Sequence, residues 1–357
     1  MSLSEMGVTS DIAWPAALAV GAGALVTTAL GTWLALIMLR RSGVVDQPND
    51  RSSHTLPTPR GGGIAVVAVL LAAWIALWAT GTAFAGVPLF LLVPAGALGL
   101  AALSWVDDLR GGIPAAPRFA LQIIAVAAGL FALPEDGAVL QGTVPFWADR
   151  LIAALLWLWF INLFNFMDGI DGITGSQTAT IGLGIFVIGF VAETASSLAL
   201  PGLAMGGVAA GFLMLNWRPA KIFMGDVGSV PLGHLVGWLL LMLSAQGHWH
   251  AALLLPAYYL ADASLTLARR IARGHRPWEA HREHAYQLAV LGGRSHSEVS
   301  LLVAACGIAL AGMALAGLLG GAAVWITLAV ACVLVVTFLW YLSRQSRLPA
   351  PGDKLGE

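Results

Sequence analysis

Residues 299–343 read VSLLVAACGIALAGMALAGLLGGAAVWITLAVACVLVVTFLWYLS, a run in which no charged side chain occurs. A helix needs about 20 apolar residues to cross the hydrocarbon core of a bilayer, so this run predicts two consecutive membrane-spanning helices. The rest of the 357-residue chain has the same character, because 58% of all residues are hydrophobic and only 10% are charged. Soluble domains carry roughly 25% charged residues. The composition therefore excludes a soluble protein and predicts a polytopic membrane protein.

Apolar runs of similar length recur along the chain and predict one all-α domain over 1–357, a bundle of about eleven transmembrane helices. The first run is too long for the core of a cleaved signal peptide, so we expect it to be retained as a span. After the last span we expect a cytoplasmic tail over 344–357. The predicted spans lie near 15–39, 62–80, 86–105, 119–134, 150–164, 178–194, 198–216, 229–246, 250–268, 299–319 and 321–343.

Positive charge alternates sharply between successive loops. Of all the Lys and Arg residues, only Arg150 falls outside one alternating set of loops. Loops rich in Lys and Arg stay on the cytoplasmic side of a membrane, so we expect the N-terminus outside and the C-terminus in the cytoplasm. Almost every polar cluster lies in the same set of loops. The pattern predicts chemistry at the cytoplasmic face of the membrane, where nucleotide-activated substrates are found.

Carboxylates mark the cytoplasmic ends of two of these spans. Asp107 and Asp108 are adjacent in the segment SWVDDLRGG, residues 104–112. Neighbouring carboxylates at a membrane face need a cation or a basic group to balance them. Asp226 stands between Gly225 and Gly228, directly before another span. We expect this glycine-flanked turn to let a phosphate approach closely, and oxygen ligands of this kind suit Mg²⁺ or Mn²⁺.

A second polar stripe lies in NLFNFMDGIDGI, residues 162–173. Asn162, Asn165, Asp168 and Asp171 recur every three residues, so they share a face as far as the helix continues. Amide and carboxylate groups where a helix leaves the bilayer are hard to explain by packing. The stripe therefore indicates a binding site rather than a packing surface.

Basic groups that can meet phosphate occur on the same predicted face. Arg60 precedes three consecutive glycines, which allow close backbone approach to an anion at the start of a helix. A long basic loop, RRIARGHRPWEAHREHAYQ at 269–287, indicates a site for a pyrophosphate or a nucleotide, or alternatively an anchor on anionic lipid. Asp262 lies within a predicted span, and an intramembrane acid is a functional candidate. The other basic candidates are Arg118, Lys221, His281, Arg282 and His284.

Four segments, DDLRG, NLFNFMDGIDG, NWRPAKIFMGDVGS and HREHAYQ, resemble in order and sidedness the polyprenyl-phosphate N-acetylhexosamine-1-phosphate transferase family, also called glycosyl transferase family 4. The resemblance covers about residues 40–290. It implies a UDP-N-acetylhexosamine donor, undecaprenyl phosphate as the acceptor in the membrane lipid, UMP as a product and Mg²⁺ as the cofactor, with Mn²⁺ as an alternative. It also implies a multi-pass protein of the bacterial cytoplasmic (inner) membrane. We expect no nucleic-acid partner and keep a homodimer open.

The resemblance also implies roles for individual residues. Asp107 and Asp108 correspond to the catalytic aspartate pair, and Asp226 to the metal ligand, together with Asn165. The remaining candidates are expected at the substrate: Asp168, Asp171, Asn162, Arg118, Lys221, His281, Arg282, His284, Arg60 and Asp262.

Several alternatives stay open. The segment His281-Arg282-Glu283-His284 replaces the histidine run of the peptidoglycan branch, which favours the start of O-antigen or another surface polysaccharide over phospho-MurNAc-pentapeptide transfer. The sugar is GlcNAc, FucNAc or QuiNAc. Direct attack by the lipid phosphate and double displacement through an aspartyl-phosphate are both compatible with the residues. A secondary transporter is a distant alternative, because transporters bind substrate near the bilayer midplane rather than at one face.

Overall fold

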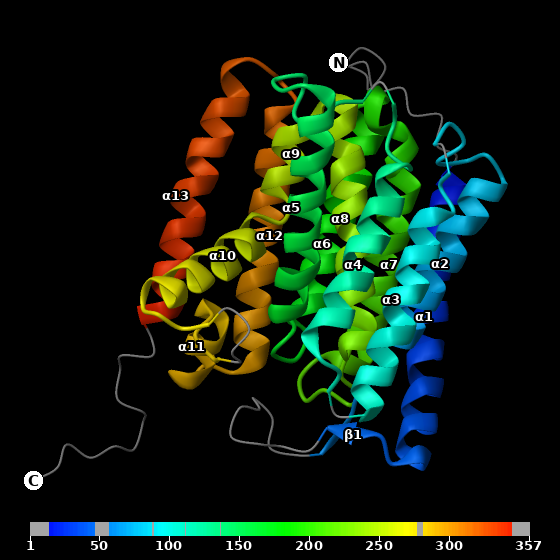
Figure 1. Cartoon of the computed structure of the whole chain (residues 1–357), viewed down its shortest axis with the longest axis vertical. Coiled ribbons are helices and arrows are strands. Elements are labelled where there is room, and N and C mark those ends of the chain that lie inside the picture. The colour runs from blue at the N-terminus through cyan, green and yellow to red at the C-terminus, as the bar shows by residue number, and fades with distance from the viewer. Residues whose placement is uncertain are drawn as a thin grey trace, which may run out of the picture.

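The computed structural model describes residues 14–46, 57–87, 89–110, 112–135, 137–276 and 281–344. The described part is an all-α bundle, as predicted, with one small hairpin formed by β1 (Val45–Asp46) and β2 (Thr58–Pro59) (Figure 1). Most helices run along the long axis of the molecule. They are α1 (Trp14–Ser42), α2 (Gly63–Ala79), α3 (Leu92–Arg110), α4 (Ala115–Leu130), α5 (Phe146–Phe166), α6 (Ile173–Val191), η2 (Glu193–Leu198), α7 (Ala199–Asn216), α8 (Asp226–Leu243), η3 (Ser244–His248), α9 (Trp249–Leu254), α10 (Ala257–Ala272), α11 (Ala285–Leu291), α12 (His296–Gly317) and α13 (Ala322–Arg344).

Eight helical segments of the described residues are long and apolar enough to cross a membrane. Helices α2 and α4 are also apolar but shorter, with 17 and 16 residues. Ten of the predicted spans thus correspond to observed helices, with boundaries that differ by a few residues. A multi-pass membrane protein follows from these lengths and compositions.

The prediction of one continuous span near 250–268 was wrong. Helix α9 ends at Leu254 and α10 begins at Ala257, and in Figure 1 α10 crosses the bundle obliquely while α9 and α13 follow its long axis. Pro256 lies at this break and has no N–H to continue a helical hydrogen-bond ladder. Because the residues on both sides are apolar, hydropathy alone does not reveal the change in direction.

The centre of the bundle is formed by α6, α7 and α8. The apolar window of α8 is entirely buried within the protein, whereas α1 and α13 bury less than a third of theirs. Glycines allow the central helices to approach closely, since a Cβ on Gly182 of α6 would lie 2.7 Å from the carbonyl oxygen of Gly202 of α7. Small residues at helix contacts are typical of membrane bundles, where tight packing replaces the hydrophobic effect.

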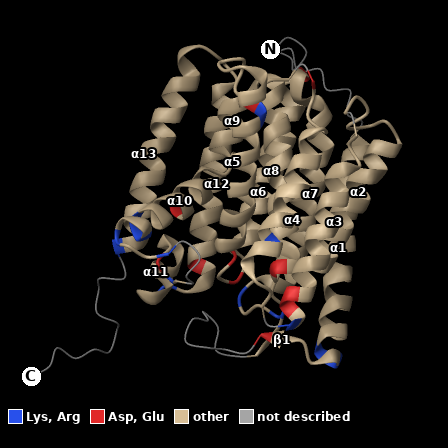
Figure 2. Cartoon of the chain, viewed as in Figure 1, with Lys and Arg blue, Asp and Glu red and all other residues tan. Residues whose placement is uncertain are grey.

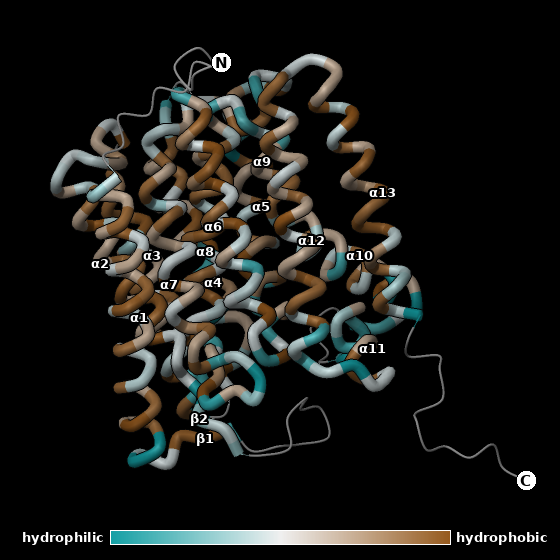
Figure 3. Tube along the Cα trace, turned by 180° about the vertical axis from the view of Figure 1, so that it is seen from behind, coloured by the Kyte–Doolittle hydropathy of each residue, from teal (hydrophilic) through white to brown (hydrophobic). Residues whose placement is uncertain are grey.

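Charged side chains gather at the end of the bundle that carries β1 and α11 (Figure 2), whereas the helices are apolar along most of their length (Figure 3). An ion pair between Asp149 and Arg150, near the start of α5, lies apart from this charged end. The charged residues that the sequence assigns to one side of the membrane therefore lie mostly at one end of the folded bundle. That this end faces the cytoplasm stays a prediction from the positive-inside rule.

Candidate active site

Three consecutive glycines at the start of α2, Gly61 to Gly63, bind the turn before α8 through backbone hydrogen bonds. The amides of Gly61 and Gly62 donate to the carbonyl of Phe223 at 3.2 and 2.8 Å, and the amide of Gly63 donates to Met224 at 2.9 Å. A Cβ on Gly63 would lie 2.1 Å from the Cα of Gly228, so no other residue fits there. The amides of these three glycines are thus already used within the protein, so any phosphate near them would be bound by other groups.

The turn before α8 needs glycine for a second reason. Gly225 has a φ of +73°, a conformation that side chains with a Cβ rarely adopt. A Cβ there would also lie 2.9 Å from Oδ2 of Asp108. The close approach brings the start of α8 against the end of α3, and the amide of Val227 donates to Oδ2 of Asp108 at 3.2 Å. Asp108 thus caps the N-terminus of α8 from a neighbouring helix.

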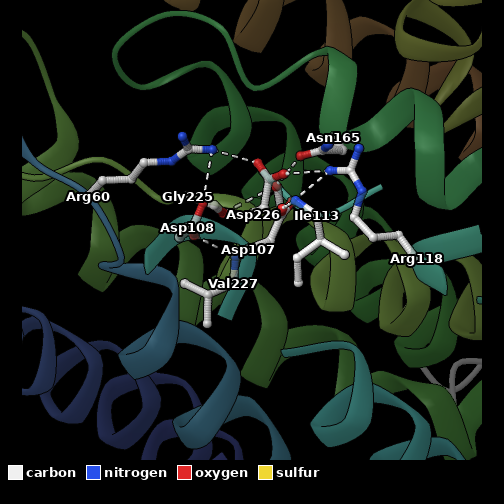
Figure 4. A network of polar contacts seen from close by, with 10 residues as sticks. Arg60, Asp107, Asp108, Ile113, Arg118, Asn165, Gly225, Asp226 and Val227 are labelled. Carbon is white, nitrogen blue, oxygen red and sulfur yellow. Dashed lines mark hydrogen bonds and ion pairs between the residues drawn. The ribbon is translucent and has the colours of Figure 1, made fainter. Parts of the chain in front are cut away.

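Three carboxylates and two guanidinium groups meet at this point (Figure 4). Nη2 of Arg60 lies 2.7 Å from Oδ1 of Asp226 and 3.1 Å from Oδ1 of Asp108. Nη1 of Arg118 lies 2.7 Å from Oδ2 of Asp107 and 3.7 Å from Oδ2 of Asp226. The two arginines reach the carboxylates from opposite sides. We call these five residues the carboxylate network. They come from segments far apart in the sequence, and Asp226 contacts both arginines and so links the Arg60–Asp108 pair to the Arg118–Asp107 pair.

The three carboxylates differ in exposure. The side chain of Asp226 is 20% exposed, whereas those of Asp107 and Asp108 are 7% and 3% exposed. Asp107 is also fixed by the amide of Ile113, which donates to its Oδ1. Asp226 is therefore the carboxylate of the network that is most accessible to a ligand, and the other two are held more rigidly beneath it.

The two asparagines of the predicted stripe have different surroundings. Asn165, in the last turn of α5, accepts a hydrogen bond of 2.5 Å from Oγ of Ser229, one turn into α8. It therefore lies beside the carboxylate network, as predicted. Asn162 donates instead to Oε1 of Gln122 on α4 at 2.8 Å and to the carbonyl of Leu158. Sequence reasoning did not assign a role to Ser229 or Gln122.

The two aspartates after α5 also separate. Burial raises the pKa of Asp168 to about 6, and the charges of Asp226 and Asp108 act in the same direction, so Asp168 lies within the field of the network. Asp171 instead links three segments: its Oδ1 lies 3.2 Å from Nδ1 of His296, and its Oδ2 accepts from the amide of Ala220 at 3.1 Å. Burial raises the pKa of Asp171, but the bond and charge of His296 outweigh this and hold that pKa below its usual value.

The loop that contains His281, Arg282 and His284 is fastened to the turn after α5. His284 is buried and stacks on Tyr286, with ring centroids 5.8 Å apart and planes at 11°. The hydroxyl of Tyr286 donates to the carbonyl of Phe166 at 3.0 Å. The fold therefore brings the basic loop to the same end of the bundle as the acidic turn, as the shared sidedness predicts.

Asp262 holds this loop from within the bundle. Its side chain is 1% exposed and accepts hydrogen bonds from the amide of Ala285 at 2.9 Å, the hydroxyl of Tyr258 at 3.0 Å and that of Thr266 at 3.2 Å. These contacts indicate a positioning role rather than direct contact with a ligand. Lys221, by contrast, is exposed on the turn between α7 and α8.

The chain is similar to known membrane transferases. Residues 89–244 match the family described as glycosyl transferase family 4. The chain is 30% identical over 324 residues to the decaprenyl-phosphate N-acetylglucosaminephosphotransferase of Mycolicibacterium smegmatis, which covers 80% of this chain and 78% of the relative. The chain therefore belongs to glycosyl transferase family 4 and is a multi-pass membrane transferase, which confirms the resemblance seen in the sequence.

Two further relatives represent the branches considered above. Over 301 residues the chain is 30% identical to the undecaprenyl-phosphate alpha-N-acetylglucosaminyl 1-phosphate transferase of Escherichia coli, with 77% of each chain covered. Over 227 residues it is 30% identical to the phospho-N-acetylmuramoyl-pentapeptide-transferase of Lacticaseibacillus paracasei, with 59% of this chain and 68% of the relative covered.

Proposed function

We propose that this chain transfers an N-acetylhexosamine-1-phosphate from a UDP-sugar to undecaprenyl phosphate and releases UMP at the cytoplasmic face of the bacterial inner membrane. The carboxylate network is the observation that carries the proposal. Its residues offer charges of both signs at the end of an apolar bundle, where a soluble nucleotide and a lipid phosphate can meet. Phosphoryl transfer depends mainly on such positioning and charge neutralisation. The names of the relatives support the coarser part of this reaction, the transfer of an N-acetylglucosamine phosphate to a polyprenyl phosphate.

The donor set of the network fits Mg²⁺, with Mn²⁺ as an alternative. Oxygens of Asp108 and Asp226 both lie within 3.1 Å of one nitrogen of Arg60, so two carboxylates already converge on a single cationic atom. The described residues contain no group of three or more His, Cys, Asp or Glu side chains placed to hold a metal. Mg²⁺ typically uses one or two carboxylates and takes its other ligands from water and substrate phosphates. We therefore assign Asp226, with Asp108 and the neighbouring Asn165, as the residues that hold it.

The protein residues neutralise and orient the reacting phosphates. In direct attack, an oxygen of the lipid phosphate forms a bond to the phosphorus that carries the sugar, and the bond from that phosphorus to UMP breaks. A phosphate monoester has its second pKa near 6, so the acceptor is mostly a dianion at pH 7 and needs no obligatory base. Arg118 and Lys221 supply positive charge for the phosphates, and a bound Mg²⁺ would act as a Lewis acid on the pyrophosphate.

The burial of Asp107 and Asp108 favours direct attack over double displacement. An aspartyl-phosphate would require one of these side chains to reach the donor phosphorus, yet they are 7% and 3% exposed and already accept hydrogen bonds. Holding the arginine and the start of α8 in place suits them better. We therefore assign the pair to the orientation of Arg118 and Asp226.

An apolar cavity of about 470 Å³ supplies a site for part of the polyprenyl chain. Its walls come mainly from α5, α8, α9 and the segment before α5, with single residues from η3, α10 and α13, and include Trp157, Phe160 and Leu240. Helix α5 continues from this cavity to Asn165, and five residues of helix rise by about 7.5 Å. One helix therefore connects an apolar cavity to the carboxylate network, as a lipid phosphate requires.

We place the reaction at the start of O-antigen or another surface polysaccharide, with GlcNAc as the first sugar to test and FucNAc and QuiNAc next. The support is the His281-Arg282-Glu283-His284 segment and the greater coverage of the N-acetylglucosamine transferases than of the peptidoglycan relative. Phospho-MurNAc-pentapeptide transfer is the second candidate, because that relative matches at the same identity.

Purified protein tests the proposal. It is incubated with undecaprenyl phosphate, Mg²⁺ and in turn UDP-GlcNAc, UDP-FucNAc, UDP-QuiNAc and UDP-MurNAc-pentapeptide, and UMP and the lipid product are measured. We expect stoichiometric UMP and a lipid-linked sugar with one of the first three donors. Turnover with UDP-MurNAc-pentapeptide as the only accepted donor would show that the chain catalyses the peptidoglycan reaction instead. Uptake of a sugar into proteoliposomes without transfer would contradict the proposal.

A further inference from the structure

Arg60 lies where a cation bound by the carboxylate network would lie. The same nitrogen, Nη2, is 2.7 Å from Oδ1 of Asp226 and 3.1 Å from Oδ1 of Asp108 (Figure 4). Arg118 contacts only the other oxygen of Asp226, at 3.7 Å, and bonds mainly to Asp107. The two carboxylates most suited to a divalent ion therefore already share one positive charge supplied by the protein.

The backbone delivers Arg60 to this position. The residue before it, Pro59, accepts a hydrogen bond from the amide of Phe223 at 2.8 Å, and the two residues after it donate to the carbonyl of Phe223. Arg60 is thus anchored beside the turn before α8 by its backbone. Its side chain, in contrast, is 35% exposed, so the guanidinium group can leave the carboxylates without disturbing the fold.

We propose that Arg60 is an exchangeable counter-ion, which neutralises Asp108 and Asp226 before the divalent cation binds and is displaced when it does. Mg²⁺ and the guanidinium group repel each other, so a Mg²⁺ bound to these two oxygens weakens both contacts of Nη2 and favours its displacement. The inference rests on the proposed metal-dependent function. In addition, we propose that competition between Arg60 and the metal for Asp108 and Asp226 sets the affinity of the site for the metal.

Once displaced, Arg60 can also bind the phosphate of the donor. A guanidinium group released at the edge of the network is free to pair with a phosphate oxygen, which it matches well in charge and geometry. Binding of the cation and of an anionic donor then favour one another, because the donor stabilises the arginine position that the metal requires.

The test measures Mn²⁺ binding to the purified full chain in detergent by electron paramagnetic resonance, without any donor or acceptor. Arg60→Met removes the competing charge and keeps an unbranched side chain, so it should tighten Mn²⁺ binding by about tenfold or more. Arg60→Lys should stay near the wild-type affinity, because both contacts of Arg60 use one nitrogen and an ammonium group can replace it. Arg41→Met, which removes an exposed arginine at the end of α1, is the matched control and should change little.

The outcomes separate this inference from the proposed function. If Asp226→Asn abolishes Mn²⁺ binding but Arg60→Met leaves it unchanged or weaker, the metal site stands and the counter-ion role of Arg60 is wrong. If Mn²⁺ binds equally to wild type and to Asp226→Asn, the metal site itself is wrong and both proposals fall. Equal tightening by Arg41→Met and Arg60→Met would show a general charge effect and overturn the inference.

Discussion

The three carboxylates of the carboxylate network differ in exposure and in the groups that they hold. Asp226 is exposed enough to meet a ligand, and the deeper Asp107 and Asp108 fix an arginine and a helix terminus. Each of the three carboxylates pairs with at least one arginine, so removing one charge alters the balance for its neighbours as well. Carboxylates at the end of an apolar bundle are costly unless balanced in this way.

We expect Asp107→Asn and Asp108→Asn to reduce transfer by about a hundredfold or more while the protein stays folded. Asparagine retains an acceptor oxygen for Ile113 or Val227 but loses the charge that orients the arginines. Incubation of wild type with donor labelled in the transferred phosphate should give no phospho-enzyme. A trapped aspartyl-phosphate would refute direct attack. Near-normal transfer rates in both variants would show that Asp107 and Asp108 are only charged groups at a helix end, without a role in the reaction.

His281 provides a pH-dependent prediction. Burial, reinforced by the charges of His284 and Arg270, lowers the pKa of His281 to about 4. Between about pH 4 and the usual histidine pKa of 6.5, the unfolded chain binds a proton that the folded chain does not, so folding loses stability as pH falls through this window. Thermal melting in detergent from pH 7 to pH 4.5 should decline less for His281→Gln than for wild type. Parallel melting curves would contradict this protonation state.

At the scale of secondary-structure elements, the site depends on the contact between the starts of α2 and α8. Gly63 and Gly228 touch backbone to backbone, and the amides of Gly61 to Gly63 bind the turn before α8. This contact sets the position of Arg60 and Asp226 together. The geometry of the network is therefore a property of two helix termini rather than of one loop.

We expect Gly63→Ala to lower both stability and transfer, because its Cβ would lie 2.1 Å from the Cα of Gly228 and backbone must move. Overpacking of this kind costs about 1–3 kcal/mol or more. Gly23→Ala on α1 is the matched control, since no atom lies within 4 Å of the added methyl group. Melting temperature and UMP release are compared for both variants. Equal behaviour of the two would show that the α2–α8 contact does not support the site.

Much of this could be predicted from the sequence, for reasons visible in particular residues. The lengths of the apolar runs predicted ten helices, charge at helix ends indicated Asp107, Asp108 and Asp226, and the three-residue spacing of a polar stripe indicated Asn165. The partner of each carboxylate depends on how distant helices pack. The contact between Asp171 and His296 therefore could not be predicted from the residues near either of them in the sequence. The break at Pro256 was missed because both flanks are apolar.

At the scale of the whole molecule, the two ends of the bundle differ in chemistry. Charged groups concentrate at the end with β1 and α11, and α1 begins at the opposite end, whereas α13 finishes near the charged one. An apolar cavity extends along α5 from the segment before this helix to Phe160. The arrangement suits a reaction between a soluble nucleotide at one membrane face and a lipid held from the side.

Topology follows from the same asymmetry. We expect reporter fusions to place the N-terminus outside the cytoplasm and the C-terminus within it, because all Lys and Arg residues except Arg150 belong to loops of one side. An alkaline phosphatase and a fluorescent protein fused to each end report opposite compartments. Cytoplasmic signals from both ends would require an even number of crossings and would remove the argument for a single reactive face.

The role of Asp226 as the main metal ligand is tested by the transfer rate of its variants. A Mg²⁺ held by Asp226 would stabilise the transition state by several kcal/mol, and each 1.36 kcal/mol is about tenfold in rate. Asp226→Ala and Asp226→Asn should therefore release UMP from UDP-GlcNAc and undecaprenyl phosphate at least about a hundredfold more slowly than wild type at low Mg²⁺. EDTA should reversibly reduce the transfer rate of the wild type to a similar extent. Full activity of Asp226→Asn at low Mg²⁺ would show that Asp226 only caps α8 and would contradict the account.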